Sequence, residues 1–448
     1  MDEWWIEPMR RVFAGRAVVL AGAMGSSWTE HVELLRSVGV SKLLVVATEG
    51  RGAGPLPDVP TLIVEPGAGL SEMERIHAAD RILHEPTTEM VDAVEVFDPT
   101  GEAIVVATFL STASQLVGRP MVASRRPQWL ALEDKVVVDA FWDRAGIERQ
   151  PSHVVALEEA GRAALQVDRG DGTVWAADAR EGFHGGASQT YWVRDDESRD
   201  RAVAGLGSVC DSVRVMPFLE GVPCSIHGIV LPDGVAVLRP VEMVTLRRGH
   251  EFSYAGCATY WDPDPITREQ MRTVARRAGA RLREEVDFRG TFTVDGVVAS
   301  DGFWPTELNP RFGAGIMTIA RGAGIPMVLV NDLIVGGHDI GRTAVELEDV
   351  VVTRGDARRG GGTWQGGLGV ELEIGSEPVQ YGDGVWAWAH PGGPVDARVS
   401  AGAGFVRCLY DQASTPVGPS TGSRAVAFWN FAASEFGIDT AGLTAAGA

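Results

Sequence analysis

The sequence predicts an α/β domain at the amino terminus, followed by a larger α+β region built on antiparallel hairpins. Three observations carry this prediction. Buried-strand patterns alternate with an amphipathic helix across residues 18–64, as is typical of a parallel sheet. Turn residues at 232–234 and 300–302 separate pairs of strand patterns, which indicates two hairpins. Beyond about Gly375, further strand patterns and a short helix predict a small α+β appendage.

The composition limits the classes of protein to which the chain can belong. The chain of 448 residues is 45% hydrophobic, which fits two to four packed units with ample core. A net charge of −20 disfavours nucleic-acid phosphate as a partner. The four Cys residues are widely spaced, so we expect a reducing cytoplasm and no structural zinc site. The longest uncharged run, 103–118, is shorter than the roughly 20 apolar residues of a membrane span. We therefore expect a cytoplasmic protein without a membrane partner. The sequence leaves open whether the protein forms a homodimer.

The amino-terminal domain, residues 1–120, is expected to contain three strands and one helix, at 18–22, 28–38, 43–47 and 61–64. The turn after the first strand contains Gly22 and Gly25. This is only a fragment of a dinucleotide fingerprint, because no third Gly follows in place. A phosphate cradle at the helix start is one interpretation, and an ordinary packing turn is the alternative that we favour.

The central region, residues 121–374, is expected to begin with a helix that starts around Glu133 and ends at Gly146. A Gly-rich loop at 178–188 lies between two strand patterns, and such a loop can donate backbone N–H groups to phosphates. A second Gly-rich stretch, 360–367, predicts a mobile loop and a candidate lid. The other predicted elements are strands at 173–177, 190–193 and 213–221 and helices at 267–284, 316–320 and 327–335.

The hairpin around residues 300–302 carries an acidic side chain on each of its two strands. If its register centres on the middle turn residue, Asp295 lies opposite Glu307, where like charges destabilise a bare sheet. Strand periodicity puts Asn309 on the same face as Glu307. Two carboxylates and an amide oxygen form a hard-cation site, for which Mg²⁺ is the best candidate. Arg311 follows the strand, where it could clamp phosphate or carboxylate. The alternative is a solvated hairpin with incidental charges.

The Glu-Leu-Asn-Pro-Arg string at 307–311, followed by a Gly-rich turn, resembles the metal-binding signature of ATP-grasp enzymes. In that family an acidic residue on one strand and Glu-x-Asn on the next hold Mg²⁺ against the phosphates of ATP. The resemblance covers roughly residues 120–340. It implies ATP and Mg²⁺ as cofactors, with Asp295, Glu307 and Asn309 as metal ligands. The implied ATP-grasp fold has a Rossmann-like pre-ATP-grasp domain at 1–120, an ATP-grasp domain at 121–374 with a flap at about 150–215, and a small α+β domain at 375–448.

The resemblance also implies nucleotide contacts. Lys135 holds the place of the lysine that reaches the ATP phosphates, and the alternative is an ordinary surface lysine. The family usually has a cation at the end of the first flap strand; residues 177–179 supply none, so Arg180 is the nearest substitute. The usual ribose-binding glutamate is also missing, and Glu220 is its replacement in this interpretation. The remaining implied contacts are Gly185 and Gly186 at the phosphates, and Met216, Phe218 and Leu219 around adenine.

The resemblance implies a ligase that activates a carboxylate as an acyl phosphate, which an amine then attacks. Arg311, Arg247 and Arg248 would contact the substrate or the intermediate. The layout is also similar to actinobacterial peptide ligases of the kind found in pheganomycin biosynthesis. That similarity implies a small carboxylate donor, a guanidino amino acid, and a peptide amine acceptor. Two alternatives stay open: another amino-acid or dipeptide ATP-grasp ligase, and a non-catalytic protein that binds ATP and Mg²⁺.

Overall fold

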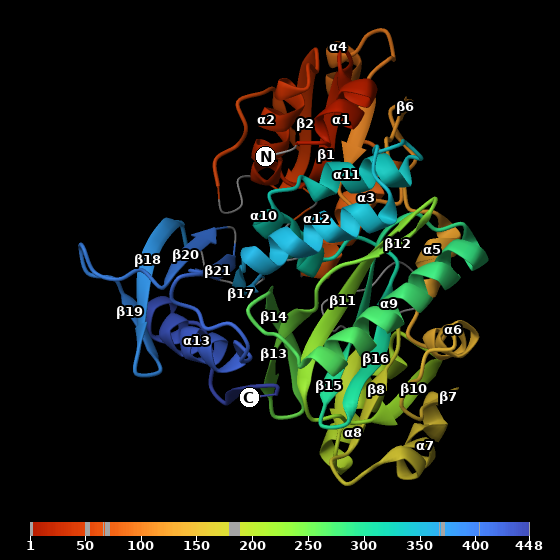
Figure 1. Cartoon of the computed structure of the whole chain (residues 1–448), viewed down its shortest axis with the longest axis vertical. Coiled ribbons are helices and arrows are strands. Elements are labelled where there is room, and N and C mark those ends of the chain that lie inside the picture. Colours follow the sequence, from red (N-terminus) through yellow and green to blue (C-terminus); the bar gives the residue numbers. More distant parts are fainter. Residues whose placement is uncertain are drawn as a thin grey trace.

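The computed structural model describes residues 3–49, 54–65, 67, 72–178, 189–366, 368, 372–402 and 404–447. Figure 1 shows an amino-terminal α/β unit in red and orange, a central region in yellow, green and cyan, and a carboxy-terminal lobe in blue. The central region lies between the other two along the chain and contacts both.

The amino-terminal unit is a parallel sheet in the order β3-β2-β1-β4. Its elements are α1 (Ile6–Phe13), β1 (Ala17–Met24), α2 (Thr29–Ser37), β2 (Lys42–Glu49), β3 (Thr61–Ile63), α3 (Glu72–His84), α4 (Thr88–Phe97) and β4 (Ile104–Ala107). Val18 and Leu20 pack on the α1 and α2 side, whereas Val19 and Ala21 pack on the α3 and α4 side. Both faces of the sheet are therefore buried, which explains the continuous apolar runs and confirms the predicted α/β unit.

The structure around Gly22 supports the packing interpretation of this turn. Strand β1 continues to Met24 and leads into a 3₁₀ turn, Gly25–Trp28. A Cβ atom on Gly22 would lie 2.5 Å from Cγ2 of Thr108 and 2.9 Å from a ring carbon of Trp28. Glycine is required because these side chains press against the strand.

A second, antiparallel sheet in the order β7-β10-β8-β9 occupies the range predicted for the flap, about 150–215. Its elements are β7 (His153–Ala156), α7 (Ala160–Val167), β8 (Thr173–Ala176), β9 (Thr190–Val193), α8 (Asp196–Gly207) and β10 (Ser212–Pro217). Trp175 and Val213 pack with the two helices in one apolar cluster. The predicted flap residues Arg180, Gly185 and Gly186 lie outside the described residues.

The largest sheet has 12 strands and runs from the central region into the carboxy-terminal lobe. Its main order is β16-β15-β11-β13-β14-β17-β21-β20-β18-β19, with β12 on β11 and β22 on β13. The strands are β11 (Val222–Leu231), β12 (Gly234–Val237), β13 (Val241–Arg248), β14 (Glu251–Ala258), β15 (Gly290–Ala299), β16 (Gly302–Asn309), β17 (Gly361–Gln365), β18 (Ile374–Gly382), β19 (Val385–Trp388), β20 (Ala397–Gly402), β21 (Phe405–Tyr410) and β22 (Leu443–Ala445).

Strand β17 joins the two parts of this sheet, since it pairs with β14 on one side and β21 on the other. The prediction of a mobile loop at 360–367 is therefore wrong for residues 361–365. Cβ atoms on Gly361 and Gly362 would lie 2.3 Å and 2.0 Å from neighbouring backbone carbonyl oxygens. These glycines allow close approach of the neighbouring strands rather than motion.

Helices cover both faces of the central strands. On one face, α6 (Val138–Ala145) and α9 (Pro265–Val286) share an apolar core with β11, β15 and β16. On the other, α10 (Ala314–Ala323), α11 (Met327–Val335) and α12 (Ala344–Ala357) share a core with the amino-terminal unit. Helix α6 starts at Val138, later than predicted, and ends at Gly146 with φ +63°. Lys135 thus lies in the connection before α6, after a 3₁₀ turn at Ala131–Glu133.

Within the described residues, no single helix has the length and apolarity to cross a membrane. The pair α10 and α11 meets these criteria together, but the two helices are bent by 118° relative to each other.

A buried carboxylate ties the carboxy-terminal lobe to the central sheet. Glu242 of β13 accepts hydrogen bonds from Ser420 Oγ (2.6 Å), Thr421 N (2.8 Å) and Thr421 Oγ1 (2.8 Å), just before α13 (Gly422–Phe436). We expect Glu242→Ala to lower the free energy of unfolding by about 2–4 kcal/mol, because several buried donors lose their acceptor. Glu242→Gln, which keeps one acceptor oxygen, should cost less. Urea unfolding of both variants measures this, and equal stability of all three proteins would contradict it.

Candidate active site

The hairpin of β15 and β16 has the predicted pairing of acidic residues, although its turn is not centred on the predicted residue. Asp295 pairs with Glu307, and Thr293 pairs with Asn309. At the turn, Ala299 pairs with Gly302, so the turn itself is one residue out of register with a centre at Asp301. An irregularity between Asp295 and Gly296 restores the register, because Gly296 pairs with Pro305 and leaves Thr306 extra.

Asp295 is partly buried within a set of polar partners. Ser225 Oγ donates to its Oδ1 (2.5 Å), and Asn309 Nδ2 donates to its Oδ2 (2.8 Å). Burial, and then the neighbouring Glu307 carboxylate, raise the pKa of Asp295 to about 7. A cation held by both carboxylates would stabilise their ionised forms, and so counteract the two effects that raise the pKa of Asp295. The site therefore has the donor set and the unbalanced charge that suit Mg²⁺.

Arg311 is anchored beside these residues. Its Nη2 donates to Asn309 Oδ1 (3.0 Å), and its Nε lies 3.4 Å from Glu133 Oε1. Arg125 also pairs with Glu133. Burial raises the pKa of Glu133, and the two guanidinium groups oppose that rise. A metal ion on Asn309 Oδ1 would have to share this oxygen with Arg311, so the arginine and the metal are coupled.

Lys135 is buried, which excludes the surface-lysine alternative. Its Nζ lies 2.9 Å from Asp178 Oδ1 and 3.7 Å from Glu307 Oε1. Its backbone N–H donates to Asp178 Oδ2 (2.7 Å). Burial alone would lower the pKa of Lys135, but the carboxylates of Glu307 and Asp178 outweigh it and raise that pKa. Sequence reasoning had noticed Asp178 only as a departure from the family pattern; here it positions the lysine beside Glu307.

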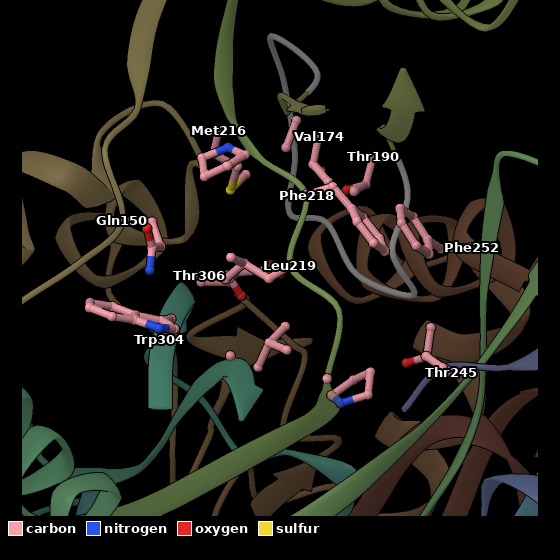
Figure 2. A pocket seen from close by; sticks show the side chains of 18 of the residues that line it. Gln150, Val174, Thr190, Met216, Phe218, Leu219, Thr245, Phe252, Trp304 and Thr306 are labelled. Atoms are coloured by element: carbon pink, nitrogen blue, oxygen red, sulfur yellow. The ribbon is translucent and has the colours of Figure 1, made fainter. Parts of the chain in front are cut away.

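A cavity of about 190 Å³ lies between the flap and the large sheet. Met216, Phe218 and Leu219, which the resemblance assigns to adenine, all line it (Figure 2). Trp304 of β16, which sequence reasoning missed, lines it as well and lies on the opposite side from the ring of Phe252 in Figure 2. The walls are mostly apolar, as expected for a site that encloses a flat base.

Glu220 and Arg247 pair with each other at this cavity. The two Nη atoms of Arg247 lie 2.7 Å and 2.8 Å from the carboxylate oxygens of Glu220. The guanidinium also lies over the rings of Phe218 (5.2 Å) and Trp192 (5.6 Å). Arg247 therefore lies beside the side chains that the resemblance assigns to adenine, whereas Arg311 lines the second pocket described below.

Arg248 lies apart from the site. Adjacent residues of a strand point to opposite faces, and Arg248 accordingly turns away from Arg247 and pairs with Asp439 (3.0 Å). Its side chain is 41% exposed. This placement does not support the predicted contact between Arg248 and a substrate.

A second pocket of about 240 Å³ adjoins the first. Asp295, Asn309 and Arg311 line it, and Glu307 and Thr306 line both pockets. Glu307 therefore lies at the boundary between a mostly apolar cavity and a polar one. Among the described residues no three His, Cys, Asp or Glu side chains gather as a metal cluster.

No family model matches the sequence, and a comparison with curated proteins finds no match. Solved structures do resemble the fold. The biotin carboxylase domain of *Hydrogenobacter thermophilus* 2-oxoglutarate carboxylase has 14% identity and a TM-score of 0.57, covering 96% of this chain and 91% of that chain. *Campylobacter jejuni* biotin carboxylase has 13% identity and a TM-score of 0.55, covering 96% and 93%. N5-carboxyaminoimidazole ribonucleotide synthetase has 12% identity and a TM-score of 0.52, covering 90% and 94%. The chain has the ATP-grasp fold.

Within this ATP-grasp fold, the raised pKa of Asp295 predicts a pH dependence. An acid whose pKa is higher in the folded chain binds its proton more tightly there, so protonated Asp295 favours folding fully below its ordinary pKa of 3.8. That contribution is lost as pH rises towards 7. Mg²⁺ requires the ionised carboxylate, so we expect its affinity to fall about tenfold per pH unit below pH 7. Calorimetric titration of Mg²⁺ at pH 5.5 to 8 checks this, and an Mg²⁺ affinity that does not change with pH would contradict it.

Proposed function

We propose that the chain is an ATP-dependent carboxylate–amine ligase. The observation that carries the proposal is the position of Glu307, opposite Asp295 and between the mostly apolar cavity and the polar pocket. A phosphoryl group that moves from ATP to a second substrate has to cross such a boundary. The Hydrogenobacter domain of similar fold was solved with MgADP and bicarbonate, which supports a nucleotide and a small acid as ligands of this chain.

In this proposal Asp295, Glu307 and Asn309 hold Mg²⁺, which fits their oxygen donors and the raised pKa of Asp295. Bound Mg²⁺ would supply charge neutralisation on the transferring phosphoryl group. Lys135 lines the nucleotide cavity beside Glu307 and would contact ATP phosphates. Arg311 lines the polar pocket and would orient the substrate carboxylate through its planar guanidinium.

The proposed reaction has two steps. A carboxylate oxygen attacks the γ-phosphorus of ATP, the bond to the β–γ bridging oxygen breaks, and ADP leaves. The amine then attacks the acyl carbon, the bond to the phosphate oxygen breaks, and the ammonium proton is lost to solvent. The products are an amide, ADP and phosphate. Most of the rate acceleration would come from orientation and electrostatics, so no nucleophilic side chain is needed.

We further propose, on the similarity of the layout of the chain to actinobacterial peptide ligases, that the donor is a guanidino amino acid and the acceptor a peptide amine. The net charge of −20 favours such cationic substrates over long distances. The described cysteines Cys210, Cys224, Cys257 and Cys408 are all buried and free, which fits a reducing cytoplasm as the place of action.

ADP release with a matrix of amino acids and short peptides tests the proposal. Sustained ADP release requires a donor acid and an amine together, because the amine must consume the acyl phosphate before the next turnover, and the product mass equals the sum of the two minus water. Tight Mg²⁺-dependent ATP binding without ADP release for any pair would favour the non-catalytic alternative. A two-amino-acid product with no reaction of longer peptides would favour a dipeptide ligase.

A further inference from the structure

A cationic cavity adjoins the polar pocket. Gly313 and Ala314 line both the polar pocket and a larger cavity of about 530 Å³. Helix α10 supplies one wall of the larger cavity, and strands β17 and β21 supply another. A substrate that reacts near Glu307 could therefore extend into a space between the central region and the carboxy-terminal lobe.

The described residues that line this cavity carry positive charge and no acidic side chain. The residues that line it include four arginines and, in the described part of the chain, neither Asp nor Glu: Arg321, Arg358, Arg359 and Arg407. Arg359 is neutralised from outside the cavity by Asp262 (2.9 Å). Arg407 donates to the neutral hydroxyl of Ser400 (3.3 Å). Its positive charge is half-buried without a described carboxylate in contact.

Arg321 and Arg407 lie close enough to repel each other. Burial, and then the charge of Arg321, lower the pKa of Arg407. An anion in this cavity would reduce the repulsion between the two guanidinium groups. The cavity also has aromatic walls, from Trp364 and Phe405 of the lobe and Phe312 of the loop before α10. It therefore combines an anion-binding feature with an apolar lining.

We propose that this cavity binds an anionic group of the substrate, a carboxylate or a phosphate ester, other than the carboxylate that is activated. The inference rests on the proposed ligase function for its biological meaning. Arg321 and Arg407 would hold the oxyanion by charge-assisted hydrogen bonds, while the aromatic walls would cover the adjoining apolar part. The α-carboxylate of an amino-acid or peptide acceptor has this chemistry. A guanidino group is disfavoured here by like charge, so a guanidino donor would bind outside this cavity.

Binding of small aromatic probes in the absence of ATP tests the inference. The probes are benzoate, phenyl phosphate and the neutral isostere benzamide, titrated by calorimetry into the full chain. We expect benzoate or phenyl phosphate to bind at least tenfold more tightly than benzamide. Arg321→Met and Arg407→Met should each reduce that binding at least tenfold. Arg398→Met is the matched control, because Arg398 is exposed on β20 outside the cavity, and it should bind as the wild type does.

Thermal unfolding supplies a second readout. Removing one of two repelling charges should leave the unfolding temperature of Arg407→Met unchanged or higher without probe, whereas a purely structural arginine would lower it. Tighter binding of phenyl phosphate assigns a phosphate ester, and tighter binding of benzoate assigns a carboxylate. Equal binding of benzamide, no binding of any probe, or wild-type binding by both variants would overturn the inference. Because ATP is absent, these results are independent of whether the chain releases ADP.

Discussion

Glu307→Gln should reduce ADP release by about 10³-fold or more while the fold stays intact. The substitution removes one of the two negative charges proposed to hold Mg²⁺, and a metal ion contributes several kcal/mol of charge stabilisation to phosphoryl transfer. It also removes the carboxylate that faces Asp295 across the hairpin. The pKa of Asp295 should then fall towards its ordinary value, and the free energy of unfolding near neutral pH should stay the same or rise.

Three measurements check this result. They are ADP release with the best acid–amine pair of the wild type, Mg²⁺ titration by calorimetry, and urea unfolding. Glu284→Gln is the matched control, because Glu284 on α9 is 67% exposed and lines neither of the two pockets. That variant should keep wild-type turnover. A nearly wild-type rate for Glu307→Gln would refute the metal assignment.

Lys135→Met should lower both stability and ATP affinity. The Asp178 side chain is only 3% exposed, and without the lysine ammonium its charge is left buried and uncompensated. Breaking one partner of such a pair costs about 3–5 kcal/mol. If Lys135 also contacts ATP phosphates, the ATP dissociation constant should rise by about 10²-fold, which corresponds to the loss of a charge-assisted contact of roughly 3 kcal/mol.

A double variant separates the two roles. Lys135→Met combined with Asp178→Asn removes the unpaired charge, so it should recover most of the lost stability. It should still bind ATP about 10²-fold more weakly than the wild type. Urea unfolding and titration with ATP and Mg²⁺ measure both quantities. Recovery of ATP affinity along with stability would show that Lys135 acts only through the fold.

The pairing within the hairpin follows largely from residues that are close together in the sequence. Strand periodicity and turn chemistry predict that Asp295 and Glu307 face each other and that Asn309 shares their face. These are short-range properties, and the pairing confirms them. The bulge at Thr306 could not be predicted in the same way, because a bulge depends on how two strands twist against neighbouring elements. The prediction reached the right pair although the turn is centred differently.

The glycines show the opposite case. A Gly-rich stretch at 360–367 indicates a loop when only local conformational freedom is considered. In the structure, Gly361 and Gly362 permit backbone strands to approach closely on both sides of β17. The same residue type serves flexibility in one context and close packing in the other. Only the neighbours, which come from β14 and β21, distinguish the two.

The sequence by itself determined the order of the elements, the α/β character of the first unit and the acidic face of the hairpin, because these follow from periodicity and turn residues close in the chain. The tertiary structure decided the charge pairing. It joined Lys135 to Asp178, turned Arg247 to Glu220 and Arg248 to Asp439, and brought Arg321 and Arg407 to one cavity. Ion pairs between distant segments depend on packing and burial of whole elements, and no local pattern records which charges will meet.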